Sequence, residues 1–229
     1  WGDEFNWGTL PIRRNISLPC YLKFNRFAKG RLFINRERRF DTTFLGNPVV
    51  IWKENYGSKM ENTRLQWLDE ISSSKQFSFS GGFFMHGPET SKLKANVGKT
   101  LQGLFLNKGR MNFASYFNLM LNAKTALAPP GNALWSYRHY EAIYAGAIPL
   151  SSDFRGAEML VPLPNEGIVH VGKGESVIPQ IEKALKMKKD NPDLPVKNLG
   201  FVEQYMTDGS YDRKKSKLLE RFMNQIEEA

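Results

Sequence analysis

The chain has 229 residues, of which 41% are hydrophobic and 13% aromatic, a composition that supports a folded core and excludes an intrinsically disordered protein. Its formal net charge of +9 favours anionic partners, which include polyanions, nucleotide diphosphates and acidic membrane surfaces. No stretch approaches the roughly 18 consecutive apolar residues of a membrane helix, so we expect no membrane span in this chain.

The cysteine count restricts redox chemistry and location. The single cysteine, Cys20, excludes an internal disulfide and a zinc site built from cysteines. It suits a reducing compartment, which favours a cytoplasmic location. The chain starts at Trp1, which is compatible with one domain of a larger protein, or with a Golgi-lumenal protein whose upstream anchor was removed.

Residues 1–39 are rich in aromatic residues and arginines, and we expect a short N-terminal segment or remnant lobe there. From residue 40 onward, β-type runs alternate with helical patterns. The expected strands are 40–46, 76–82, 124–129, 147–151 and 167–172. The expected helices are 62–72, 112–123, one opening near Ser136, 176–188, 199–207 and 211–228, with a proline-containing loop at 190–195.

Strands that alternate with helices predict an α/β fold with a Rossmann-like, doubly wound parallel sheet. We expect one such domain over residues 40–229, ending in C-terminal helices. Within the 112–123 helix, apolar residues recur at helical spacing, which favours a core-facing stripe over a ligand site. Its members are Phe113, Tyr116, Phe117, Met120 and Leu121.

The segment 124–150 carries the pattern with most chemical content: a strand, a glycine-containing loop, a helix and a second strand. Ligands of open parallel sheets bind beyond the carboxyl ends of the strands, where helix N-termini offer amide donors to anions. Ser136 can cap the helix. Arg138 opposes the helix dipole in the first turn unless an anion lies nearby.

Glu141 follows Arg138 by three residues, so both lie on one helix face. The cation could then bind phosphates while the carboxylate binds ribose hydroxyls of the same nucleotide. The alternative is an ordinary salt bridge between the two side chains. Spacing alone leaves both interpretations open.

Several motifs occur in order between about residues 40 and 152. They are Phe44-Leu-Gly46, Arg64-Leu65, Pro129-Pro-Gly131, Ser136-Tyr-Arg138-His-Tyr-Glu141-Ala142 and Gly146-Ala-Ile-Pro149. Together they resemble the signature of the exostosin-like glycosyltransferases. The sequence departs from that pattern at Tyr137, where proline is frequent, and in having only about 40 residues before the Phe-x-Gly strand.

The resemblance implies a GT-B-like donor domain with a shortened N-terminal part. It places Glu141 towards the ribose and Arg138, with Arg64, towards the diphosphate of a nucleotide-sugar. Gly131 and Ser136 belong to the same expected donor site. A UDP-sugar is favoured before a GDP-sugar as the donor substrate, with no other cofactor.

The function predicted from these motifs is a glycosyltransferase that moves a sugar to a glycan hydroxyl with inversion. The sequence contains no Asp-x-Asp motif, which favours transfer without a metal ion. For the catalytic base, His86 follows an expected strand, and Asp153 is the next candidate. The alternatives are a noncatalytic nucleotide or glycan binding module and, less favoured, a basic nucleic-acid-binding domain; we expect no nucleic-acid partner.

Overall fold

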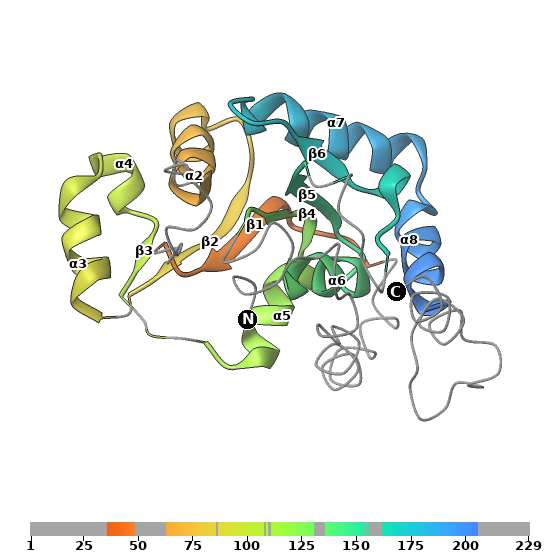
Figure 1. Cartoon of the computed structure of the whole chain (residues 1–229), viewed down its shortest axis with the longest axis horizontal. Helices are drawn as coiled ribbons and strands as arrows, with labels where there is room; N and C mark the ends of the chain where they lie inside the picture. The colour runs from red at the N-terminus through yellow and green to blue at the C-terminus, as the bar shows by residue number, and fades with distance from the viewer. Residues whose placement is uncertain are drawn as a thin grey trace, which may run out of the picture.

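The computed structural model describes residues 36–48, 63–85, 87–107, 109, 111–130, 136–153, 155 and 162–205. These residues form a parallel β-sheet covered by helices on both faces (Figure 1). The strands are β1 Phe40–Gly46, β2 Phe79–Phe84, β3 Phe105–Leu106, β4 Ala123–Ala128, β5 Ile148–Ser152 and β6 Val169–Val171. The helices are α2 Thr63–Ser74, α3 Gly87–Asn96, α4 Lys99–Gln102, α5 Phe113–Leu121, α6 Tyr137–Tyr144, η4 Asn165–Gly167, α7 Val177–Asp190 and α8 Leu194–Glu203.

The sheet has six strands in the order β3-β2-β1-β4-β5-β6, and every neighbouring pair is parallel. The prediction of a Rossmann-like, doubly wound sheet is therefore confirmed. The strand order reverses between β1 and β4, because the chain leaves β3 at one edge and returns to the centre of the sheet through α5. Such a reversal opens a crevice at the carboxyl ends of the two central strands.

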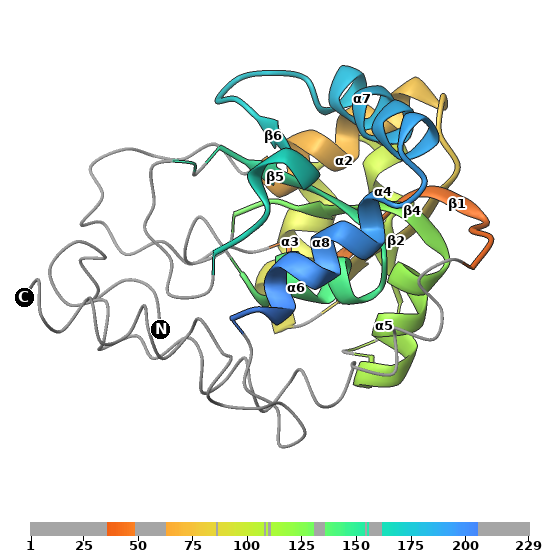
Figure 2. The same cartoon turned by 90° about the vertical axis from the view of Figure 1, so that its right-hand side faces the viewer.

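Two hydrophobic clusters hold the helices on opposite faces of the sheet. One cluster joins α2, α4 and α7 through residues such as Trp67, Leu68 and Ile181. The other joins α5, α6 and α8 through residues such as Phe117 and Tyr140. Figures 1 and 2 show α2 and α7 on one side of the sheet, with α6 and α8 on the other.

The helix at the end of the described chain starts earlier than predicted. The expected loop at 190–195 and helix at 199–207 were wrong at this boundary, because α8 runs from Leu194 to Glu203. Its proline, Pro195, lies in the first turn, where the missing N–H of proline has no helical partner to lose. The expected helix at 211–228 lies outside the described residues.

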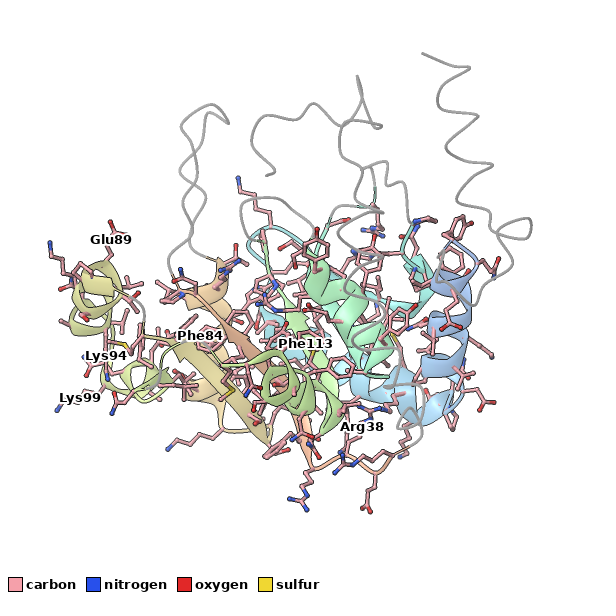
Figure 3. The ribbon with its side chains drawn as sticks, turned by 90° about the horizontal axis from the view of Figure 1, so that it is seen from below. Arg38, Phe84, Glu89, Lys94, Lys99 and Phe113 are labelled. Atoms are coloured by element: carbon pink, nitrogen blue, oxygen red, sulfur yellow. The ribbon has the colours of Figure 1, made fainter. Side chains whose placement is uncertain are left out.

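The sequence also failed to indicate α3, α4 and β3. Helix α3 buries only Thr90, so its apolar periodicity is too weak to detect. Figure 3 shows Glu89, Lys94 and Lys99 of α3 and α4 pointing away from the sheet. These two helices cover the β3 edge and lie far along the sheet from the β1–β4 crevice (Figure 1).

The buried Arg38, two residues before β1, connects this end of the sheet to the C-terminal ends of α5 and α6. Its guanidinium donates to the carbonyls of Met120 at 3.1 Å, Leu121 at 3.2 Å and Ala123 at 3.1 Å, and to the carbonyl of Ala145 at 2.7 Å. The Met120, Leu121 and Ala145 carbonyls lie at the C-termini of α5 and α6, the negative ends of the helix dipoles, where a cation is stabilising, and Ala123 is the first residue of β4. In the described ranges, no helix has both the length and the apolar character needed to cross a membrane.

Candidate functional site at the β1–β4 crevice

Two arginines from opposite faces of the sheet reach across the crevice between β1 and β4. Arg64, in the first turn of α2 after β1, donates from Nε to the carbonyl of Pro130 beyond β4, at 2.9 Å. Arg138, in the first turn of α6 after β4, donates from Nη2 to the carbonyl of Leu45 in β1, at 2.9 Å. Each guanidinium is therefore held by the strand end that its own helix does not follow.

The charges of the two guanidinium groups act on one another. Arg64 also donates from Nη1 to the carbonyl of Asn47, at 2.6 Å, two residues beyond the Leu45 carbonyl that binds Arg138. In an extended chain, carbonyls two residues apart, as those of Leu45 and Asn47 are, lie about 7 Å from one another. Burial, followed by the charge of Arg138, lowers the pKa of Arg64 to about 10, so Arg64 remains charged at neutral pH.

Phe44 and Gly46 form the surface against which Arg138 packs. The guanidinium carbon lies 4.7 Å from the centre of the Phe44 ring, within the range of a cation–π contact. A Cβ on Gly46 would lie only 2.9 Å from Arg138 Nη2 and 2.9 Å from Phe44 Cζ. The absence of a side chain at position 46 therefore lets the arginine lie against the strand.

Glu141 lies beside the arginines but pairs with a tyrosine. Its side chain is buried, with 6% exposed, and its Oε2 accepts a hydrogen bond from the Tyr116 hydroxyl of α5 at 2.7 Å. Within the described part of the chain, Glu141 and Arg138 form no ion pair of 4.0 Å or less. The salt-bridge interpretation of their spacing is therefore wrong.

Ser136 is the N-cap of α6, as predicted, with an extended backbone. Its backbone N–H lies 3.1 Å from Nδ1 of His139, and Nε2 of His139 lies 2.7 Å from Oγ of Ser151 in β5. The Ser151 hydroxyl donates to the Ser152 carbonyl at 3.0 Å. Nδ1 of His139 also lies 2.9 Å from the Ser136 carbonyl, so both ring nitrogens have polar partners. Burial lowers the pKa of His139 to about 4.

The N-termini of α6 and α7 differ in their charge environment. The α7 terminus is already occupied by a carboxylate, because Glu70 Oε2 accepts from the Ser176 hydroxyl at 2.7 Å and from the Val177 N–H at 2.8 Å. The first turn of α6 carries Arg138 and no acidic residue. Of these two termini, α6 is the one whose surroundings favour an added anion.

The remaining predicted residues lie at other positions. Asp153 follows β5 and is exposed, and its carboxylate is bound by Arg155 at 2.6 Å. The hydrogen bonds from Arg155 lower the pKa of Asp153 well below its usual range. His86 and Gly131 lie outside the described residues, so their predicted roles stay predictions.

Chemically, the crevice offers two fixed cations and one fixed carboxylate. Two like charges held close together repel one another, and a doubly charged anion between them would relieve that repulsion. Among the described residues, no group of three or more His, Cys, Asp or Glu side chains is arranged to hold a metal ion. The geometry therefore suits a polar ligand with an anionic group and hydroxyl groups.

The sequence did not indicate the roles of three residues at this site. Tyr116 packs against the core, as the apolar stripe of α5 predicted, but its hydroxyl also binds Glu141. The ring of Phe44 was noted only as part of a strand motif. His139 received no role, and only its contact with Ser151, twelve residues further along the chain, indicates one.

No family model matches the sequence, and no curated protein matches it. Six solved chains are similar to it in structure. One of them comes from a crystal structure of a GtfA/B complex, with a TM-score of 0.48 and 11% identity. The alignment covers 84% of this chain and 37% of that chain. At this identity the likeness concerns the fold and not the chemistry of the site.

Proposed function

We propose that the chain is a glycosyltransferase that binds the diphosphate of a nucleotide-sugar between α2 and α6. The observation that carries the proposal is the crossing of Arg64 and Arg138 over the β1–β4 crevice. This is the place where open parallel sheets bind nucleotides. The order of the surrounding motifs, which resembles the exostosin-like glycosyltransferases, supports the same assignment.

Each side chain of the crevice has a role in this proposal. The two arginines bind the diphosphate and stabilise the negative charge that develops on it as the leaving group. Glu141 accepts hydrogen bonds from the ribose hydroxyls. We propose a UDP-sugar as the first donor to test and a GDP-sugar as the second.

The transfer itself forms a bond between an acceptor glycan oxygen and the anomeric carbon of the sugar. The bond from that carbon to the diphosphate breaks, and a base takes the proton of the acceptor hydroxyl. His86 and Asp153 are the candidate bases. Because its ion pair with Arg155 lowers the pKa of Asp153, this carboxylate accepts a proton less readily, so His86 is the base to test first.

Ligand-induced thermal stabilisation tests the donor site. We would titrate the full chain, without added metal, with inorganic pyrophosphate, UDP, GDP and UDP-sugars. A ligand at a hundred times its Kd stabilises a fold by about 2.7 kcal/mol. Stabilisation that Arg64→Ala and Arg138→Ala abolish is the expected result, and no stabilisation by any of these ligands would overturn the proposal.

Arg39→Ala is the matched control for these variants. It removes the same charge from an exposed position next to the start of β1, at the edge of the sheet opposite the crevice, so the binding should persist. Turnover is then measured as release of the nucleoside diphosphate in the presence of glycan acceptors. Binding without turnover across an acceptor panel would instead identify a nucleotide-binding module.

A further inference from the structure

The contact between Tyr116 and Glu141 joins two helices at the wall of the crevice. Tyr116 lies in the first turns of α5, and its ring packs beside Phe113 with ring centres 6.2 Å apart. Glu141 lies in α6, and the hydroxyl of Tyr116 donates to its Oε2 at 2.7 Å. One oxygen of the Glu141 carboxylate is therefore fixed by Tyr116, a residue outside the sequence motifs that predicted the nucleotide site.

A buried carboxylate needs a hydrogen-bond donor to remain in place. The nearest helical candidate, Arg138, is turned towards the Leu45 carbonyl and the Phe44 ring. Tyr116 supplies the donor instead. Without the Tyr116 hydroxyl, we expect Glu141 to form an ion pair with Arg138, three residues away on the same helix. In such a pair the two charges would neutralise one another, and neither would be available to a ligand.

We propose that Tyr116 is a positioning residue that sets the preference of this site for ribonucleotides. It holds one oxygen of Glu141 so that the other faces the ligand as an acceptor for the vicinal hydroxyls of a ribose. A site that presents a fixed acceptor to a hydroxyl disfavours the analogue that lacks it, because the acceptor is then left without a partner. The inference rests on the proposed function, since it assumes a nucleotide in the crevice.

The tyrosine is suited to this role because it stays a donor. Burial raises the pKa of Tyr116 far above its usual value; the charge of Arg138 acts in the opposite direction, and Glu141 raises the pKa further. The hydroxyl is therefore protonated at all working pH values. It donates its hydrogen bond to Oε2 of Glu141, and the other carboxylate oxygen is then the acceptor for ligand hydroxyls.

The test is Tyr116→Phe, with Kd values measured by calorimetry on the full chain. The probes are inorganic pyrophosphate, a ribonucleoside diphosphate and its 2′,3′-dideoxy analogue. We expect the wild-type protein to bind the ribonucleotide about 10- to 100-fold more tightly than the dideoxy analogue, the range for a hydrogen bond to a charged group. In Tyr116→Phe this ratio should fall towards one, while the Kd of pyrophosphate changes by less than about threefold.

Tyr205→Phe is the matched control, because it removes a hydroxyl from a residue that packs against the same cluster. It should keep the wild-type ratio. A Tyr116→Phe protein that retains the full ribose preference would overturn the inference. So would a loss of affinity shared equally by all three probes, because that pattern is what a merely structural tyrosine produces.

The same probes separate the inference from the proposed function. If the wild-type protein does not bind pyrophosphate, the anion site itself fails; if it binds pyrophosphate and shows no ribose preference, only the role of Tyr116 fails. Should Tyr116→Phe not fold, Glu141→Gln replaces it. The Tyr116 hydroxyl would then hold the amide oxygen and turn the NH2 group to the ligand, so the ratio should fall, and a retained ratio would overturn the inference.

Discussion

Arg138 and Glu141 lie three residues apart on α6 and do not pair with one another. Arg138 donates to the Leu45 carbonyl of β1, and Glu141 accepts from Tyr116 of α5. A salt bridge on one helix contributes only about 0.2–0.5 kcal/mol. The absence of this salt bridge therefore costs little stability. It leaves the Arg138 cation and the Glu141 acceptor available side by side in the crevice.

Gly46→Ala should weaken anion binding without unfolding the domain. The added methyl would lie 2.9 Å from both Arg138 Nη2 and Phe44 Cζ, so the Arg138 guanidinium must move away from β1. We expect the Kd of pyrophosphate to rise about tenfold, equivalent to about 1.4 kcal/mol, with a loss of about 1–3 kcal/mol in the free energy of unfolding from overpacking. Calorimetric titration and urea unfolding measure the two effects.

Gly200→Ala is the control for this substitution. A Cβ on Gly200, in α8, has no neighbouring atom within 4 Å, and alanine in a helix is about 0.5–1 kcal/mol more stable than glycine. The control should bind pyrophosphate with the wild-type Kd and unfold at higher urea. An unchanged Kd in Gly46→Ala would show that the position of Arg138 against β1 does not matter for the anion.

His139 should make the fold sensitive to acid between pH 6.5 and pH 4. Burial lowers the pKa of His139 to about 4 from an ordinary 6.5, so across this window the unfolded chain holds a proton that the folded chain lacks. The free energy of unfolding therefore falls as the pH falls, by up to about 3 kcal/mol. Urea unfolding of the wild type and His139→Gln at pH 7 and pH 4 measures this contribution.

At pH 7, His139→Gln should be less stable than the wild type, because it loses the contacts that the imidazole makes with Ser136 and Ser151. At pH 4 the difference should have narrowed, since the variant carries no group to protonate at this position. Carboxylates elsewhere titrate in both proteins and cancel in the comparison. Unfolding curves that stay the same distance apart at both pH values would contradict the assigned neutral histidine.

The sequence was sufficient to predict the fold and to select the two arginines and the glutamate of the crevice. Strand β1 has the predicted bounds, and the alternation of strands and helices predicted the doubly wound sheet. Arg138 was selected because it opposes the helix dipole in the first turn after an expected strand, and Arg64 because the resemblance to the exostosin-like glycosyltransferases includes it. Local patterns and general rules of topology carry this much of the structure.

The hydrogen-bond partners of the site residues could not be predicted from the sequence. Tyr116 and Glu141 are 25 residues apart in sequence, and nothing local distinguishes a tyrosine that serves a carboxylate from one that fills the core. The same holds for Arg38, which belongs to a cluster of arginines that would ordinarily be exposed, yet binds carbonyls more than 80 residues away. Pairings of this kind depend on how the helices pack, which periodicity does not encode.

Arg38→Met should destabilise the domain strongly. The substitution removes the donor from carbonyls at the ends of α5 and α6 and at the start of β4, and each unsatisfied buried acceptor costs about 1–3 kcal/mol. Four carbonyls are affected, so we expect the free energy of unfolding to drop by about 3 kcal/mol or more. Arg39→Met, at the exposed neighbouring position, should change it by less than about 0.5 kcal/mol.

Lys188 should limit stability at neutral pH. This half-buried lysine near the end of α7 lies 3.4 Å from the Gly146 carbonyl, and burial, with the charges of Arg38 and Lys124, lowers its pKa from 10.5 to about 7. Between these two pH values the unfolded chain holds the proton and the folded chain does not. The free energy of unfolding therefore rises with pH across the window, and below pH 7 the full cost of the buried charge remains.

Lys188→Met removes that cost together with the long hydrogen bond to Gly146. We expect the variant to be more stable than the wild type by about 1–2 kcal/mol at pH 6, after allowing for solvent screening of a partly exposed group, and about equally stable at pH 10. Lys189→Met, at the exposed position next along the helix, should show no such pH dependence. If Lys188→Met is less stable than the wild type at pH 6, the ammonium must stabilise the C-terminus of α6 by more than its burial costs.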